Sequence, residues 1–384
     1  MTAPVQIRIE AGPHPRKDCP LYCASPAGLD HRRHYALQDG RGRRLPVQIL
    51  APGTAEAKLF FVLPVLPARQ SRTYSLVPSN RPRRVLELIE HHDTLDVLSN
   101  GKLFTTLHTG SQWVRPFLYP LNGPTGSSLT RSWPIAPGPE GESTDHPHQK
   151  SFWTAWGDLS GCNNWSDSEH GHGSIRCRTR EVCVAGPLLA RIRLQLDWLT
   201  EKGKRQLDEC RELTFYQLPG QNSLLDLQIT FSACHGAVTF ADTKEGGLCS
   251  LRVACAMEGT RGGSIVNAYG GSGEEETWGK RAPWCDYSGR LPDGEAGVCI
   301  MDNPDNYCYP TYWHVRNYGL MTANPFGLSY FHQDKSRDGS MTLAAGQQCT
   351  FRYRVFCHRG DTHEAAVAER FLDYIHPPKV TLES

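Results

Sequence analysis

The amino-acid sequence predicts an all-β protein, a large antiparallel β-sandwich closed by one helix near the C-terminus. Three observations support this fold class. Apolar and polar residues alternate with a period of two in many short segments, 36 glycines and 27 prolines separate these segments, and only one stretch has a clear helical pattern. Many short strands joined by Gly and Pro turns are typical of sandwiches and barrels.

The alternation is clearest in three segments spread along the chain. Because successive side chains of a strand point to opposite faces, each segment places its apolar residues on one face. These faces consist of Ile192, Leu194, Leu196 and Trp198; of Leu225, Leu227, Ile229 and Phe231; and of Phe351, Tyr353, Val355 and Cys357. The pattern predicts half-buried strands.

Local signals predict one hairpin and one helix. Asn100-Gly101 stands between two apolar runs, and this dipeptide suits a type I′ turn, whose two central residues need positive φ. We expect a helix from about Thr362 to Ile375. Asp361 can cap it, and Val367, Phe371 and Tyr374 form its apolar stripe.

A short basic stretch, SNRPRR at 79–84, suggests a boundary in the chain. We expect residues 1–80 to form a small N-terminal β segment or accessory sheet. Residues 81–384 then form the large sandwich domain that carries the site. No repeat of 20 to 50 residues stands out, so a solenoid or a propeller is not expected.

Composition narrows the function classes. Lys plus Arg number 41 against 40 Asp plus Glu, so no global field favours a nucleic acid. The longest apolar stretch, Leu59 to Leu66, is too short to span a membrane. The start has neither a basic nor an apolar signal region, which predicts a cytoplasmic protein. The 14 cysteines are scattered without a C-x-x-C pair, so we expect reduced core thiols, with a disulfide framework as the alternative.

Two long stretches, 115–173 and 262–327, interrupt the alternation and combine polar with aromatic residues. In the first, GESTDHPHQKSFWTAWGD places His146 and His148 on the same side of an extended segment. Asp145 and Glu142 can orient an imidazole there. This pattern indicates a proton-transfer pair or two ligands of one divalent metal ion; histidines that only bond loop carbonyls are the alternative. Trp153 and Trp156 flank the loop.

A second histidine pair, His170 and His172, stands beside Glu169 in SEHGHGS. Its glycines suggest a surface turn, and only proximity to the first pair would make it a ligand set.

The segment VTFADTKEGGLCSLRVACAM reads as strand, turn and strand. Gly246-Gly247 would form the tight turn and present Lys244 and Glu245 at a strand end. A solvated hairpin tip is the alternative. Arg252, inside an apolar strand, must meet a carboxylate or line a pocket.

The richest segment runs from Trp278 to Phe326 and holds three Trp, five Tyr and one His among several cations. Flat aromatic rings suit the C–H face of a sugar, and guanidinium groups pair with carboxylates or hydroxyls. We therefore predict a carbohydrate cleft, with an aromatic core cluster as the alternative. Its substrate-binding candidates are Arg115, Arg252, Trp278, Lys280, Trp284, Arg316 and Asn324.

Several of these segments, RPFLYPLNGPTG with TRSWP, GESTDHPHQKSFW, DTKEGG, WGKRAPWCDYSG and YPTYWHVRNYGLMTANPFG, resemble a bacterial family labelled "methane oxygenase PmoA". The resemblance spans about Val85 to Tyr374. It implies the β-supersandwich of galactose mutarotases and related polysaccharide lyases. Such domains also occur beside sugar oxidoreductases. A membrane oxygenase subunit would need spanning segments, which this sequence lacks. Gln149 stands where a third histidine is expected after His148.

The catalytic candidates are His146, His148, Lys244, Glu245 and His314. Bases next to cations suit proton abstraction beside a carboxylate, with the cations stabilising the developing charge. We therefore expect an enzyme that acts on a sugar or sugar-acid glycoside, small or oligomeric, by β-elimination or glycoside cleavage. An aldose mutarotase or epimerase and a non-catalytic sugar-binding sandwich are the alternatives. The three segments that carry these residues should converge on one face.

Overall fold

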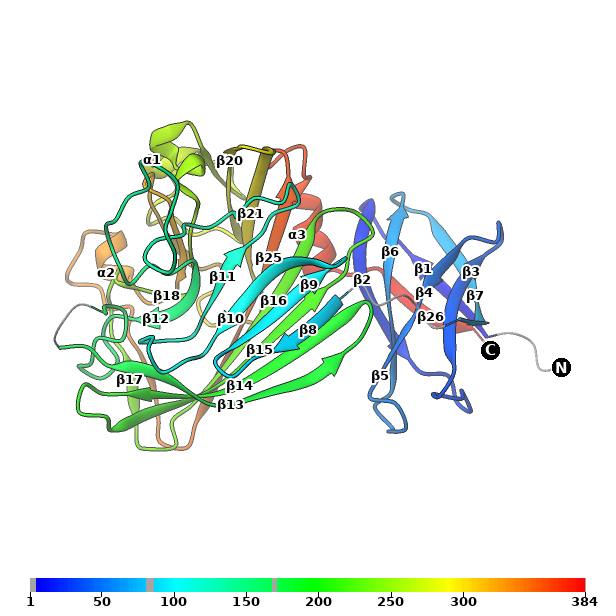
Figure 1. Ribbon diagram of the computed structural model, residues 1–384, viewed down its shortest axis with the longest axis horizontal. Helices are drawn as coiled ribbons and strands as arrows, with labels where there is room; N and C mark the ends of the chain where they lie inside the picture. Colours follow the sequence, from blue (N-terminus) through cyan, green and yellow to red (C-terminus); the bar gives the residue numbers. More distant parts are fainter. Residues whose placement is uncertain (1–4, 81–85, 168–170, 384) are drawn as a thin grey trace.

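The computed structural model describes residues 5–80, 86–167 and 171–383. Two eight-stranded antiparallel sheets pack face to face and form the body of the molecule (Figure 1). This architecture confirms the predicted all-β antiparallel sandwich. In the described part of the chain, no helix is long and apolar enough to cross a membrane.

The first sheet carries most of the candidate site residues. Its strands, in spatial order, are β22 (Tyr312–Val315), β23 (Leu320–Asn324), β18 (Gly246–Arg252), β12 (Phe152–Trp156), β11 (Phe117–Leu121), β10 (Lys102–His108), β9 (Thr94–Ser99) and β8 (Leu86–Glu90). Strands β9 and β10 form the predicted hairpin, and Asn100 and Gly101 both have positive φ, at 53° and 73°.

The second sheet consists of β13 (Ser174–Ala185), β14 (Leu189–Leu199), β15 (Arg205–Tyr216), β16 (Ser223–Ser232), β25 (Gln348–Arg359), β21 (Gly294–Asp302), β20 (Trp284–Leu291) and β19 (Ser264–Asn267). Two short strands, β17 (Val238–Phe240) and β24 (Met341–Leu343), pair separately. The three predicted alternating segments are β14, β16 and β25, and their apolar faces are buried as expected.

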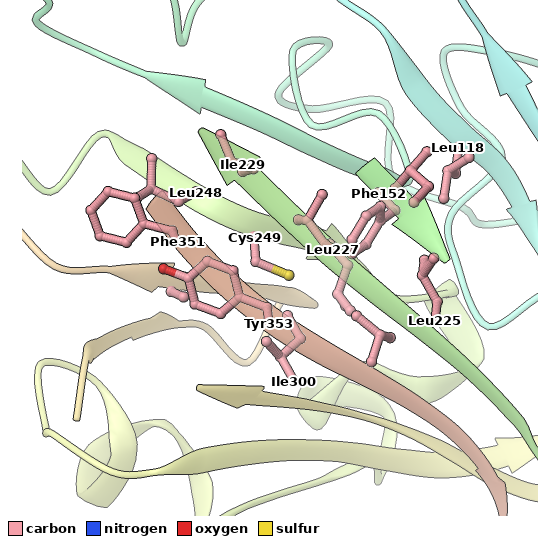
Figure 2. Close-up of a cluster of buried hydrophobic side chains, with 14 of the residues drawn as sticks. Leu118, Phe152, Leu225, Leu227, Ile229, Leu248, Cys249, Ile300, Phe351 and Tyr353 are labelled. Atoms are coloured by element: carbon pink, nitrogen blue, oxygen red, sulfur yellow. The ribbon is translucent and has the colours of Figure 1, made fainter. Parts of the chain in front are cut away.

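The core lies between the two sheets. Figure 2 shows part of it, where Leu227 and Tyr353 of the second sheet gather with Cys249 of the first. All 14 cysteines lie within the described residues, and all are unpaired. Burial raises the pKa of the Cys249 thiol well above its usual range, so the thiol stays neutral and packs as a small apolar group.

The N-terminal strands form a unit with its own apolar core. One sheet contains β26 (Lys379–Glu383), β1 (Gln6–Glu10), β7 (Ser71–Ser79), β3 (His34–Asp39) and β4 (Arg44–Pro46); the other contains β2 (Arg16–Ala24), β6 (Lys58–Leu66) and β5 (Gln48–Leu50). Because β26 pairs with β1, the last strand of the chain returns to this unit. Most of the predicted boundary stretch, residues 81–84, lies outside the described residues.

The predicted C-terminal helix is shorter than expected. Helix α3 spans Val367–Ile375, whereas residues 361–366 form turns. Asp361 caps these turns through the N–H groups of His363 and Glu364, and Ala366 at φ +51° prevents a continuous helix. Helix α3 lies between the sandwich and the N-terminal unit (Figure 1). Two shorter helices, α1 (Gly273–Thr277) and α2 (Leu328–Phe331), and two 3-10 turns, at Cys255–Met257 and Gly259–Arg261, complete the secondary structure.

The inter-sheet core predicts the effect of a truncation. Leu227→Ala should lower the free energy of unfolding by about 2–5 kcal/mol, because Leu227 is 1% exposed and its removal leaves a cavity. Urea denaturation followed by circular dichroism measures this change. The matched control is Leu103→Ala at a position 36% exposed, where the change should stay within about 0.5 kcal/mol. Equal effects at both positions would contradict the assigned core.

Candidate active site

The candidate site lies on the face of the first sheet that points away from the second sheet. On β22, Trp313 and Val315 enter the inter-sheet core, so His314 between them faces the other way. His314 pairs in register with Thr322 of β23, which in turn pairs with Ser250 of β18. The hydroxyls of Ser250 and Thr322 are 2.5 Å apart. Arg252 follows Ser250 on the same face, so three adjacent strands form one polar surface.

His314 is fixed in one tautomer. Its Nδ1 lies 2.7 Å from the carbonyl oxygen of Lys244. A carbonyl can only accept, so Nδ1 carries the proton and Nε2 keeps its lone pair. Burial lowers the pKa of His314 to about 4, which makes the imidazole neutral near pH 7. Glu245 and Arg316 both lie close enough for their charges to act on this imidazole.

Asn324 holds the segment that carries Lys244. Its side-chain amide donates to the carbonyl oxygens of Thr243, Lys244 and Gly246 at 3.0 to 3.2 Å. Asn324 itself is fully buried. The residue predicted to bind substrate therefore positions the carbonyl that orients His314.

The predicted hairpin at Gly246-Gly247 is wrong. Both glycines belong to β18, while β17 pairs with β24 instead of returning along β18. A side chain at Gly246 would collide with the ring of Trp156, and one at Gly247 with Thr322, so these glycines permit close packing rather than a turn. Lys244 and Glu245 still precede a strand, partly exposed and 3.5 Å apart.

Arg252 meets carboxylates, as the sequence predicted. It is fully buried, and its guanidinium lies 3.1 Å from Asp145 and 3.7 Å from Glu258. It also donates to the side-chain oxygen of Gln149 at 2.7 Å and lies 4.5 Å from the ring centroid of Tyr318. Gln149, at the position expected for a third histidine, thus bridges Arg252 and the Tyr318 hydroxyl.

His146 stacks on Tyr318, with ring centroids 5.1 Å apart and planes 9° apart. Its Nδ1 lies 3.0 Å from Asp145. Burial raises the pKa of Tyr318, so the phenol stays protonated. Tyr318 was not among the predicted residues, although it lies in the motif that contains His314 and Arg316. The stack joins the His146 loop to the segment that follows β22.

Arg131 is a second buried arginine that sequence reasoning missed. It donates to the carbonyl oxygens of Ser143, Asp145, His146 and Gln149, and it pairs with the Asp145 carboxylate at 2.8 Å. Arg131 lies in an irregular segment, so no strand periodicity indicated its burial. It fixes the backbone of the loop that carries both histidines.

His148 is half-buried, and its ring centroid lies 5.7 Å from that of His146. Burial, with the nearby Arg115 charge, lowers its pKa to about 3, and Nε2 has no hydrogen-bond partner among the described residues. Arg115 does not reach a substrate: it is buried and donates to the carbonyls of His148, Asn164, Trp165 and Ser166. Lys150 forms a buried ion pair with Asp167 beside it.

Further predicted residues divide into those near the site and those away from it. The Trp278 ring centroid lies 6.4 Å from that of His314, and Arg316 pairs with Glu274 at 3.2 Å while 5.9 Å from the Tyr318 ring. Lys280 is exposed, and its backbone bonds to Thr277 and Trp313. Trp284 packs in a separate apolar cluster on the second sheet, so its predicted place in the cleft is wrong.

The other residues of the histidine motifs have structural roles. Trp153 and Trp156 are buried in two apolar clusters and cannot flank an open pocket. Glu142 accepts the backbone N–H groups of Ser132 and Trp133. His172 bonds the carbonyl of Gly173, whereas His170 and Glu169 lie outside the described residues.

Few side chains that could bind a metal ion are grouped at this site. The rings of His146 and His148 are 5.7 Å apart at 76°, and His146 Nδ1 already contacts Asp145. Within residues 5–80, 86–167 and 171–383, no three His, Cys, Asp or Glu side chains are grouped as a metal site requires. The arrangement instead offers a neutral base, a protonated phenol and cations, which together can move protons.

The chain belongs to a protein family whose model matches residues 94–372, well over half of its length. That family is described as a family of unknown function (DUF6807). The predicted resemblance to a "methane oxygenase PmoA" family therefore stays a prediction. No curated protein matches the sequence.

Solved structures with a similar fold share little sequence. A glycosyl hydrolase family 38 protein from Enterococcus faecalis and an alpha-mannosidase from Enterococcus faecalis V583 each have a TM-score of 0.43 and 10% identity over 100% of this chain. This chain spans about half of theirs, 48% and 46%. A Klebsiella pneumoniae protein described as an aldose 1-epimerase has a TM-score of 0.36 and 11% identity, over 93% of this chain and 96% of its own.

The lowered pKa of the half-buried His148 predicts a loss of stability in acid. The folded pKa of His148, about 3, lies below its ordinary 6.5, so the unfolded chain binds protons first. The stability that the neutral His148 provides is present above about pH 6.5 and is lost as pH falls toward 3. His148→Phe should flatten the pH dependence of the free energy of unfolding in this window, as measured by urea titrations at several pH values. His91→Phe, at an exposed histidine, is the control, and an equal flattening there would refute the assignment.

Proposed function

We propose that this chain, from a family without a described function, is a carbohydrate-active enzyme that binds a sugar acid on the polar face of the first sheet. The observation that carries the proposal is the Nδ1 bond of His314 to the Lys244 carbonyl, which leaves Nε2 as a neutral base close to Glu245 and Arg316, whose charges also act on Tyr318. This is the arrangement that proton abstraction requires.

The reaction we favour is β-elimination at a sugar-acid glycoside. His314 Nε2 takes the proton from the carbon next to the carboxylate, and Arg316 pairs with that carboxylate as negative charge develops on it. The C–H electrons form the double bond as the bond to the glycosidic oxygen breaks. The leaving oxygen takes a proton from Tyr318, whose raised pKa keeps it protonated. Water then returns the proton to Tyr318 and removes one from His314.

Buried groups beside these residues hold the site in place. Arg252 lies under the Tyr318 ring, and Gln149 contacts the Tyr318 hydroxyl. His146 covers Tyr318 from the solvent side and can stack on or bond to the sugar. Trp278 contacts His314, and Tyr312 stacks on Phe331, which also contacts His314, so both add aromatic surface near the base.

An aldose mutarotase or epimerase is the second candidate. It needs one acid and one base at the anomeric centre, and the proximity of Glu245 to His314 favours such a pair. The two reactions give different products, namely an unsaturated sugar in one case and faster anomeric exchange in the other.

Replacement of the base should abolish turnover. The protein is incubated with uronide-containing oligosaccharides, neutral glycosides and free aldoses, and unsaturated product, reducing ends and anomeric exchange are followed. His314→Gln should lower kcat by about 10²- to 10⁴-fold, because general-base catalysis contributes that much. His235→Gln, at a histidine in the turn after β16 that bonds Asp208 of β15, should leave kcat unchanged. If the wild type binds these sugars without turnover, the enzyme proposal fails and the protein is a sugar-binding module.

The pH profile identifies the base. Because the neutral form of His314 is required and its pKa is about 4, kcat/KM should stay level through neutral pH and fall only below about pH 4. Short stopped assays at each pH measure this acid limb of the kcat/KM profile. Activity regained after return to neutral pH shows that the loss is not caused by irreversible denaturation. A fall in kcat/KM near pH 6.5, the ordinary pKa of a histidine, would instead identify a less buried histidine as the base.

A further inference from the structure

A small polar cavity of about 290 Å³ lies on the outer face of the second sheet, far in the fold from the candidate active site. Side chains of β14, β15, β16 and β25 meet α3 there. These side chains belong to the alternate positions that the inter-sheet core does not use. A volume at the low end of the range for ligand pockets suits a small ligand.

Two arginines, one from β14 and one from β25, line this cavity on opposite sides. Arg191 of β14 donates from Nε to the hydroxyl of Thr214 on the neighbouring strand β15, at 3.1 Å. Arg352 of β25 donates from Nε to the side-chain oxygen of Gln228 on β16, at 3.2 Å. Since β15 and β16 are adjacent, both guanidinium groups point toward the middle of the four strands.

Neither of these arginines has a carboxylate partner in the described parts of the chain. The neighbouring arginines of the same face differ: Arg193 pairs with Glu212 at 2.7 Å, and Arg354 pairs with Asp226 through two bonds of 2.7 and 2.8 Å. The carboxylates that line the cavity are thus already neutralised. The terminal N–H groups of Arg191 and Arg352 remain as unneutralised donors.

Tyr374 of α3 supplies a third donor. Its hydroxyl oxygen accepts a hydrogen bond from Asn303 at 3.0 Å, which leaves its own proton for another acceptor. Burial raises the pKa of Tyr374, so the proton is retained. The Tyr374 ring also packs on Arg354, 4.5 Å from the guanidinium carbon, which holds the ring in place.

We infer that this cavity is a binding site for a small oxyanion, the carboxylate, sulfate or phosphate group of a small molecule, held by Arg191, Arg352 and Tyr374. An oxyanion accepts hydrogen bonds, and two guanidinium groups and a hydroxyl that line the same cavity supply the donors. The site is separate from the proposed reaction, so it stands whether or not His314 is a catalytic base.

Titration calorimetry with sulfate, phosphate and glucuronate, at constant ionic strength in sodium chloride, tests the inference. The wild-type protein should bind at least one of these anions at a saturable site that persists in Arg316→Gln, a change that removes the carboxylate contact proposed for the active site. Glucose should not bind there. Arg191→Gln and Arg352→Gln should each weaken binding about tenfold, because each removes a charge-assisted bond. Tighter binding of glucuronate than of sulfate and phosphate would identify a sugar acid as the ligand, and the reverse a free inorganic anion or its ester.

Arg193→Gln is the matched control, since this arginine lies on the same face but is already paired with Glu212. It should leave the affinity unchanged. Circular dichroism and the urea midpoint show whether each variant is folded. Absence of saturable binding by the wild type, or an equal loss of affinity in Arg193→Gln, would overturn the site.

Discussion

The burial of two guanidinium groups, Arg131 and Arg252, constrains the whole candidate active site. A buried cation costs roughly several kcal/mol unless partners compensate it. Both groups converge on the carboxylate of Asp145, one from the loop after β11 and one from the central strand β18. The remaining N–H groups of Arg131 bind carbonyls of residues 143–149. The histidine loop is therefore tied to the sheet, and His146, at φ +47°, is held against Tyr318.

The sandwich that buries the apolar faces also fixes the position and protonation state of His314, the proposed base. His314 is flanked by two core residues of β22, so the strand can shift only if Trp313 leaves the core. Its burial removes the protonated form at neutral pH, and the Lys244 carbonyl chooses the tautomer. Burial and tautomer together give a neutral imidazole with one free lone pair, without a nearby carboxylate in contact with Nδ1.

Sequence periodicity predicted the fold well because one face of each long strand must be apolar, as in β14, β16 and β25. It failed at Gly246-Gly247, where a local turn signal competed with the packing of Trp156 and Thr322 against bare backbone. The site was predicted in part. Arg252 was found because a charge stands out in an apolar strand, and His314 because it lies in an aromatic-rich motif, whereas Arg131 and Tyr318 lie in irregular segments. Their roles depend on contacts with residues distant in sequence, and Arg115 was misassigned for the same reason.

The cations of the site differ in whether a ligand can reach them. Arg131 and Arg252 are fully buried and share the carboxylate of Asp145, so a substrate that used them would have to displace Asp145 from both. Arg316 is 36% exposed, and its partner Glu274 is 25% exposed. An ion pair near the surface contributes only about 0–1 kcal/mol, so a ligand carboxylate can replace Glu274 at little cost. In the proposed reaction, Arg316 is therefore the group that distinguishes a sugar acid from a neutral sugar. Mutarotation needs no such group, which is our reason to propose elimination first.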